Sequence, residues 1–145
     1  MNFFDSLKIS ASGMRAQRLR TEVISSNLAN INTTRTAQGG AYKRKEVIFA
    51  AIPLGGDFHE LLVSASTNYL REVGVAGIVT DPRPPILKYD PNHPDADDKG
   101  YVAFPNINLV EEMVDLISST RSYEANVAAF NAAKDMALKT LEIGK

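Results

Sequence analysis

Residues 108–144 have the sequence NLVEEMVDLISSTRSYEANVAAFNAAKDMALKTLEIG, with no proline and no glycine before the last position. Apolar side chains recur in it at alternating steps of four and three residues, the spacing of a coiled-coil seam. Eight of the ten positions so spaced are apolar: Leu109, Met113, Leu116, Thr120, Tyr123, Val127, Phe130, Lys134, Ala137 and Leu141. Such a helix spans about 54 Å, whereas a compact chain of this size has a radius of gyration of about 15 Å. We therefore expect the helix to project and to be covered by something outside the chain.

Small side chains form a second face of this predicted helix. The residues are Ala125, Ala128, Ala129, Ala132 and Ala133, with Met136. Asn108, followed three residues later by Glu111, predicts the start of the helix, and Gly144 predicts its end. We expect the large-residue seam to meet an N-terminal helix of the same chain, and the alanine face to meet neighbouring molecules.

A first helix is predicted from residue 3 to about residue 32, with Asn2 or Asp5 as its N-cap. It has two apolar faces. One consists of Phe4, Leu7, Ala11 and Met14, and the other of Ile9, Ala16, Leu19 and Val23. A helix with two apolar faces needs two partners. Burial inside one domain would provide them, but little of the chain remains to do so.

The middle of the chain has a different composition, with all seven prolines between residues 53 and 105. Short strands are predicted at residues 42–49, 61–63, 73–79 and 101–102, and extended chain at residues 81–85 because each residue before proline is steered away from the helical region. The sequence therefore predicts a predominantly helical α+β fold, with long terminal helices forming a coiled-coil-like pair around a small β-rich insertion. The expected boundaries are residues 1–34, 35–105 and 106–145.

Charge is distributed unevenly along the chain. Residues 1–45 contain eight Lys or Arg and two Asp or Glu, whereas residues 46–145 contain eight and fifteen. Either surface charge is simply uneven, or a basic N-terminal arm pairs with an acidic C-terminal arm, within or between subunits. Nucleic acid is not an expected partner, because the basic arm has no interleaved aromatic residues and the chain as a whole has a net charge of −1.

Targeting signals and cysteine chemistry are not predicted. The chain has no cysteine, which excludes a disulfide framework, and it has no apolar run of the roughly 20 residues that a membrane helix needs. The N-terminus lacks the basic start, apolar core and small-residue site of a cleavable signal. If the protein leaves the cytoplasm, we expect a dedicated route.

Candidate catalytic groups are equally scarce. His59 and His93 have no spaced partner, and no phosphate-binding, zinc-protease or nucleophile-elbow motif occurs. The acidic stretch that starts at Asp95 fails as a calcium loop because Lys99 and Asn106 occupy the required fifth and twelfth ligand positions. We expect no enzyme activity, no cofactor, no metal and no small-molecule substrate.

Several motifs resemble the bacterial flagellar rod and hook proteins. Residues 25–30, SSNLAN, are similar to their asparagine-rich stretch, which here contains Asn27, Leu28, Ala29 and Asn30. Residues 90–97, 100–108, 112–117 and 121–126 resemble the proximal rod members of this family, as do residues 40–45, although Ala41 stands where proline is common. Residues 52–80 match nothing beyond similar length.

The resemblance implies a structural subunit of the basal-body rod, which crosses the periplasm and transmits torque. It implies export through the flagellar type III apparatus without signal cleavage, and assembly with copies of itself and other rod subunits through both terminal helices. Related subunits carry an export motif that Phe3 and Leu7 fit, although both also suit an ordinary helix face. The expected assembly residues are Leu7, Met14, Leu19, Val23, Leu109, Met113, Leu116, Tyr123, Ala125, Val127, Ala129, Phe130, Ala132, Ala137 and Leu141.

A cytoplasmic helical adaptor or secretion chaperone is the alternative interpretation. It would use the same heptads to bind a partner helix. Fractionation separates the two hypotheses, because a chaperone stays in the cytoplasm whereas a rod subunit purifies with basal bodies.

Overall fold

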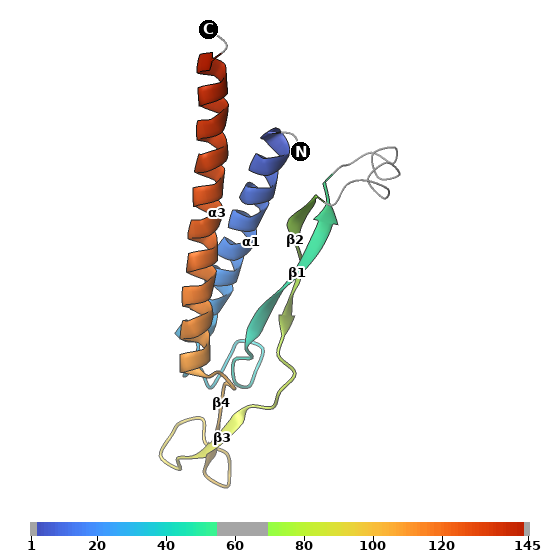
Figure 1. The fold of residues 1–145 in the computed structure, drawn as a ribbon. Coiled ribbons are helices and arrows are strands. Elements are labelled where there is room, and N and C mark those ends of the chain that lie inside the picture. The colour runs from blue at the N-terminus through green and yellow to red at the C-terminus, as the bar shows by residue number, and fades with distance from the viewer. Residues whose placement is uncertain (1–2, 55–69, 144–145) are drawn as a thin grey trace.

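The computed structural model describes residues 3–54 and 70–143. Two long helices form its body: α1 (Phe3–Ala29, 27 residues) and α3 (Leu109–Ile143, 35 residues). They lie side by side and antiparallel, so the two ends of the chain are at the same end of an elongated molecule (Figure 1). The prediction of two long, packed terminal helices around a small antiparallel β insertion is confirmed.

The ends of the helices follow from local hydrogen bonds. Asn108 is the N-cap of α3, because its Oδ1 accepts a hydrogen bond from the backbone N–H of Val110 at 3.0 Å. Helix α1 ends three residues before the predicted position. There the Asn30 amide donates to the backbone carbonyl of Ser26 at 2.8 Å, and Thr33 Oγ1 donates to Asn30 Oδ1 at 3.1 Å. These side-chain bonds stabilise the turn that follows the helix.

The first ribbon pairs β1 (Lys45–Pro53) with β2 (Arg71–Thr80) in antiparallel register and lies along α1 (Figure 1). Ile48 pairs with Gly77 and Phe49 with Val75, so Ala76 is an extra residue that forms a bulge. The bulge lies between Gly74 and Gly77 of β2. The strand predicted at residues 61–63 and His59 lie outside the described residues.

The second ribbon pairs β3 (Ile86–Tyr89) with β4 (Tyr101–Phe104) at the end opposite the termini (Figure 1). A polar turn precedes Tyr101, where Asp97 Oδ1 accepts hydrogen bonds from the backbone N–H groups of Lys99 and Tyr101, at 2.9 and 2.8 Å. Gly100 has a φ of +81°, a conformation that only glycine adopts without strain.

The interior of the described chain is thin. Its buried apolar side chains are Ala16, Val23, Ile24, Val47, Val102, Ile107 and Ala133, and its buried polar ones are Ser10, Ser12, Asn27, Glu112 and Ser119. Nearly as many polar as apolar side chains are thus buried, while twenty large hydrophobic residues of the described chain are exposed. Among residues 3–54 and 70–143, no helix combines the length and hydrophobicity needed to cross a membrane.

Candidate assembly interface

A polar junction at the base of the helix pair fixes how α1, β1 and α3 meet. Its centre is Asn27, whose side chain is fully buried. The Asn27 Nδ2 group donates to the carbonyl of Lys45 at 2.9 Å and to Glu112 Oε2 at 3.0 Å. Its Oδ1 accepts from the Lys45 N–H at 3.0 Å and from the Tyr42 hydroxyl at 3.1 Å. All four hydrogen-bonding positions of this amide are therefore used.

Glu112 is also completely buried, and Arg44 supplies its counter-charge through Nε. The same guanidinium lies 3.3 Å from Glu46 and 3.7 Å from Asp115, and Asp115 in turn accepts a hydrogen bond from Arg20 at 2.9 Å. Burial works to lower the pKa of Arg44, but the hydrogen bond and charge of Glu112 and the charge of Glu46 outweigh it and raise the pKa above its usual range. Arg44 is thus a permanent cation that joins three carboxylates.

The contacts between the helices repeat every seven residues. On α3 the positions that face α1 are Glu112, Ser119, Asn126 and Ala133. Ser119 Oγ lies 3.0 Å from Thr21 Oγ1. Further along, a Cβ added to Gly13 would lie 2.5 Å from Asn126 Oδ1, so the two helices approach closely there. The helix pair keeps a heptad repeat, but its seam consists of small and hydrogen-bonded polar residues.

The seam that the sequence predicts on α3 does not coincide with these four positions. Leu116, Val127, Phe130 and Ala137 are half-buried, but Leu109, Met113, Tyr123 and Leu141 are exposed. Ala133, placed on the outer alanine face, is instead buried against α1, whereas Ala125, Ala129 and Ala132 are exposed. The physical reason is that a buried helix contact does not require large apolar side chains when small residues permit close approach and polar ones are paired.

The two apolar faces of α1 have different surroundings. Val23 is buried beside Val47 of β1, and Leu19 lines a groove with Val73 of β2. The Val73 N–H also donates to Ser12 Oγ at 3.0 Å. The first ribbon therefore supplies the internal partner that the chain was expected to lack. Leu7 and Met14, on the opposite face, are only half-buried.

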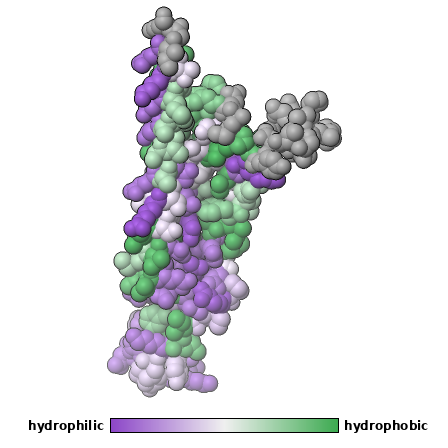
Figure 2. Space-filling model, in the orientation of Figure 1, coloured by the Kyte–Doolittle hydropathy of each residue, from purple (hydrophilic) through white to green (hydrophobic). Residues whose placement is uncertain are grey.

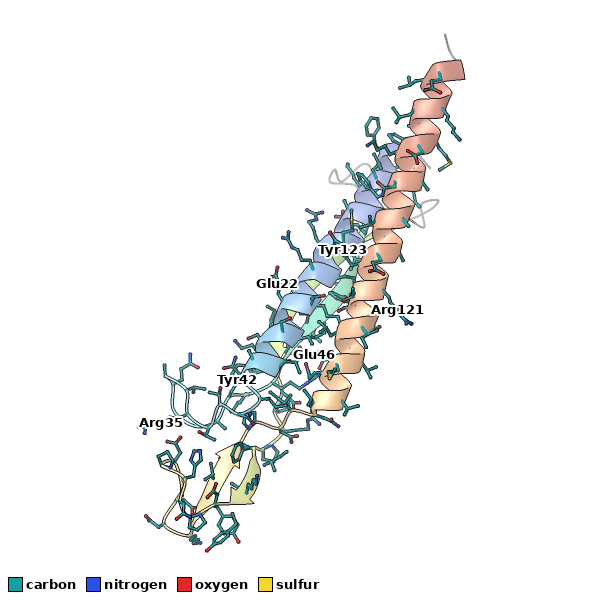
Figure 3. The ribbon with its side chains drawn as sticks, turned by 90° about the vertical axis from the view of Figure 1, so that its left-hand side faces the viewer. Glu22, Arg35, Tyr42, Glu46, Arg121 and Tyr123 are labelled. Atoms are coloured by element: carbon teal, nitrogen blue, oxygen red, sulfur yellow. The ribbon has the colours of Figure 1, made fainter. Side chains whose placement is uncertain are left out.

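Large hydrophobic side chains are exposed on the outer side of α3. Val110, Met113, Val114 and Ile117 follow a helical spacing on the face directed away from α1, with exposed fractions of 50–68%. Figure 3 shows Arg121, one turn beyond, also pointing away from the helix pair. We call these four residues the α3 outer stripe. Three of them do not follow the coiled-coil spacing from Leu109 and were therefore not predicted from the sequence.

Apolar surface is exposed at two further places. Phe3, Phe4, Ala133, Met136, Ala137 and Leu141 line an open groove of about 560 Å³ where α3 extends beyond α1. The β1–β2 ribbon exposes Ile48, Ile52, Ile78 and Val79, and Figure 2 shows this hydrophobic surface beside the helices. An isolated two-stranded ribbon is marginally stable in water. Exposed patches of this kind are typical of protein–protein interfaces.

The sequence motifs are explained in part by this geometry. Within the SSNLAN stretch, Asn30 hydrogen-bonds at the end of the helix, but Asn27 has the larger role of joining three elements. Leu28 is half-buried and Ala29 is exposed. The partnership of Asn27 with Glu112 and Arg44 was missed, and the signal for it was the presence of all three within motif stretches.

Comparisons with known proteins give the family. Residues 7–35 match the family model described as "Flagella basal body rod protein", and residues 98–143 match "Flagellar basal body rod FlgEFG protein C-terminal". The flagellar basal-body rod protein FlgC of Bacillus subtilis is 49% identical, with 100% of both chains covered. The chain belongs to the FlgC family of flagellar basal-body rod proteins. The FlgC proteins of Borreliella burgdorferi and Aquifex aeolicus are 45% and 40% identical, over at least 98% of each chain.

Membership of the FlgC family confirms the predicted function class. The chain is a non-enzymatic structural subunit of the flagellar basal-body rod, where it assembles with other rod subunits. The resemblance found in the motifs extends over the full chain, including residues 52–80, for which the sequence suggested no match. The alternative of a cytoplasmic adaptor or chaperone has no support from these relatives.

Proposed function

We propose that this subunit polymerises into the rod through the outer faces of its two terminal helices. The observation that carries the proposal is the α3 outer stripe: Val110, Met113, Val114 and Ile117 are at least half exposed although the helix contact beside them is built from polar groups. Burying one large aliphatic side chain contributes about 1.5–3 kcal/mol. Apolar side chains that would normally form a core are thus exposed and available for burial against neighbouring subunits.

Substitution of the stripe tests the proposal. Ile117→Asp places a charge on the exposed stripe, so we expect the isolated chain to keep its helix content while rods fail to assemble and cells do not swim. Ile86→Asp on β3 is the matched control, because Ile86 is 50% exposed and Ile117 53%. Normal rods containing Ile117→Asp, or an equal defect from Ile86→Asp, would contradict assembly through the terminal helices. Basal bodies are counted by electron microscopy.

The polar contact between α1 and α3 within the chain suits export of an unfolded chain. A helix contact made of Ser119, Asn126 and Gly13 has little apolar area to separate, so pulling the helices apart costs less than opening a leucine seam. We propose that the chain passes unfolded through the flagellar type III apparatus into the periplasm, folds there as neighbours cover its apolar faces, and then transmits torque through many such contacts.

The proposed export motif is Phe3 and Leu7. Both lie on α1; Phe3 lines the apolar groove beside Ala133, with its ring 5.5 Å from that of Phe4. Phe3→Ala should lower the amount of exported protein, whereas the control Phe4→Ala, which removes the neighbouring ring from the same groove, should not. Equal export of both variants would assign Phe3 to packing alone. Export is measured by immunoblot of the cellular and exported fractions.

A further inference from the structure

The helix pair contains opposite charges that the single chain does not use. Helix α1 carries four basic and two acidic residues, and α3 carries three basic and six acidic ones. Arg20 pairs with Asp115 at the base of the pair. Lys8 and Arg15 of α1 are exposed, as are Asp135 and Glu142 of α3, and none of these four forms an ion pair with another described residue.

These unpaired charges have matching spacings. Lys8 and Arg15 are seven residues apart, as are Asp135 and Glu142, and each interval corresponds to about 10.5 Å along a helix. When α1 and α3 lie antiparallel, a register that places Lys8 opposite Glu142 therefore also places Arg15 opposite Asp135. These ion pairs cannot form within one chain. There Gly13 faces Asn126, so Arg15 lies beside a part of α3 that is about 16 Å along the helix from Asp135.

We propose that α1 of one copy binds α3 of a second copy in this register, with Lys8 opposite Glu142 and Arg15 opposite Asp135. The proposal rests on assembly through the terminal helices and names the partner surface. The same register sets Arg18 against Ala132, and a small residue there leaves room for the arginine stem. Both surfaces of the contact are present on every copy and they are different, so the contact is heterologous and can repeat from one copy to the next.

The surroundings of the two charged rows are mixed. Glu22 lies 3.6 Å from Arg18, and Glu72 lines the groove beside Arg15 and Arg18. Lys134 and Lys139 flank Asp135 on α3. Exposed ion pairs contribute little affinity, but like charges that face each other are penalised, so such pairs select one register over others. The apolar side chains of the two helices therefore supply most of the affinity between the two copies, and the charged pairs select the register.

Cysteine cross-linking tests the register directly, because the chain has no cysteine of its own. The variant Arg15→Cys/Asp135→Cys should give disulfide-linked dimers and higher oligomers in oxidised basal bodies. A disulfide requires Cα atoms within about 7 Å, which the two positions of one chain do not reach. The matched control Lys8→Cys/Asp135→Cys is out of register by seven residues and should give none. Assembled rods without cross-links at 15 and 135 would overturn the register while leaving the rod function intact.

Charge exchange provides the second measurement. Arg15→Glu and Asp135→Arg should each lower incorporation of the subunit into basal bodies several-fold, because each places like charges opposite one another. The double variant restores opposite charges and should recover incorporation. If the double variant is incorporated into basal bodies no better than the single variants, the proposal is overturned.

Discussion

The amide of Asn27 on α1 donates a hydrogen bond to the carboxylate of Glu112 on α3 at 3.0 Å, and neither side chain is accessible to solvent. These residues are 85 positions apart in the sequence. Burying a carboxylate is costly unless it is paired and hydrogen-bonded, and here Arg44 and Asn27 satisfy both requirements. The junction therefore defines the angle and the register of the helix pair more than it adds to stability.

Asn27→Asp keeps the shape of the side chain but places a second carboxylate beside Glu112 and removes the amide donor. We expect a loss of about 3 kcal/mol in the free energy of unfolding, because breaking a buried charged network leaves an uncompensated charge. Urea unfolding followed by far-ultraviolet circular dichroism measures it. Asn32→Asp, at an exposed position just after the helix, is the control and should change stability by less than about 0.5 kcal/mol. Equal stabilities for the two variants would show that Asn27 is not structurally central.

The helices, the ribbon character of the insertion and the class of function were all predictable from the sequence. Periodicity and capping residues such as Asn108 are local signals, so they identify a helix reliably. The seam was not predictable in the same way. Glu112 and Ser119 are polar, and only the long-range contacts with Asn27 and Thr21 make their burial favourable. The spacing of large apolar residues instead predicted Leu109 and Met113, which are exposed.

The partner of the second face of α1 was missed for a related reason. Val23 is covered by a ribbon whose strand β2 begins 48 residues later. Pairing of β1 with β2 depends on nonlocal register, for which neither strand carries a turn signal of its own. The exposed apolar stripes, in contrast, were expected from composition: the chain has more amphipathic helix surface than its own core can cover.

Close approach of the helices at Gly13 gives a second prediction. Alanine would raise intrinsic helix propensity by about 1 kcal/mol, but its Cβ would lie 2.5 Å from Asn126 Oδ1. We expect Gly13→Ala to destabilise the helix pair despite the better propensity, and Gly13→Ala/Asn126→Ala to be more stable than Gly13→Ala alone. A double-mutant cycle from urea midpoints measures the coupling. Additive effects would mean that the helices do not touch at this level.

The link between the two ribbons contains a titratable pair. The Arg83 guanidinium hydrogen-bonds to Asp81 and lowers the pKa of that carboxyl below its usual range. Because the pKa in the folded chain is below the unfolded value, the pair contributes above the unfolded pKa and its contribution is lost as the pH falls through the folded one. We expect the carboxyl carbon of Asp81 to titrate by NMR at a lower pH than that of an ordinary aspartate, and Arg83→Gln to raise that midpoint. Arg35→Gln, which removes a cation paired instead with Asp95, should leave it unchanged; a midpoint insensitive to Arg83→Gln would contradict the assignment.

Arg44 is the residue whose chemistry is least replaceable. Its guanidinium reaches Glu112 through Nε while its terminal nitrogens lie near Glu46 and Asp115. Lysine keeps the charge but is a single point donor that cannot span three carboxylates. We expect Arg44→Lys to lower the free energy of unfolding by about 2 kcal/mol, since hydrogen bonds to charged groups contribute roughly 1.5–3 kcal/mol each. Lys43→Arg, at an exposed neighbouring position, is the control and should be neutral. If Arg44→Lys unfolds at the wild-type urea concentration, charge alone supports the junction and the fork geometry is not required.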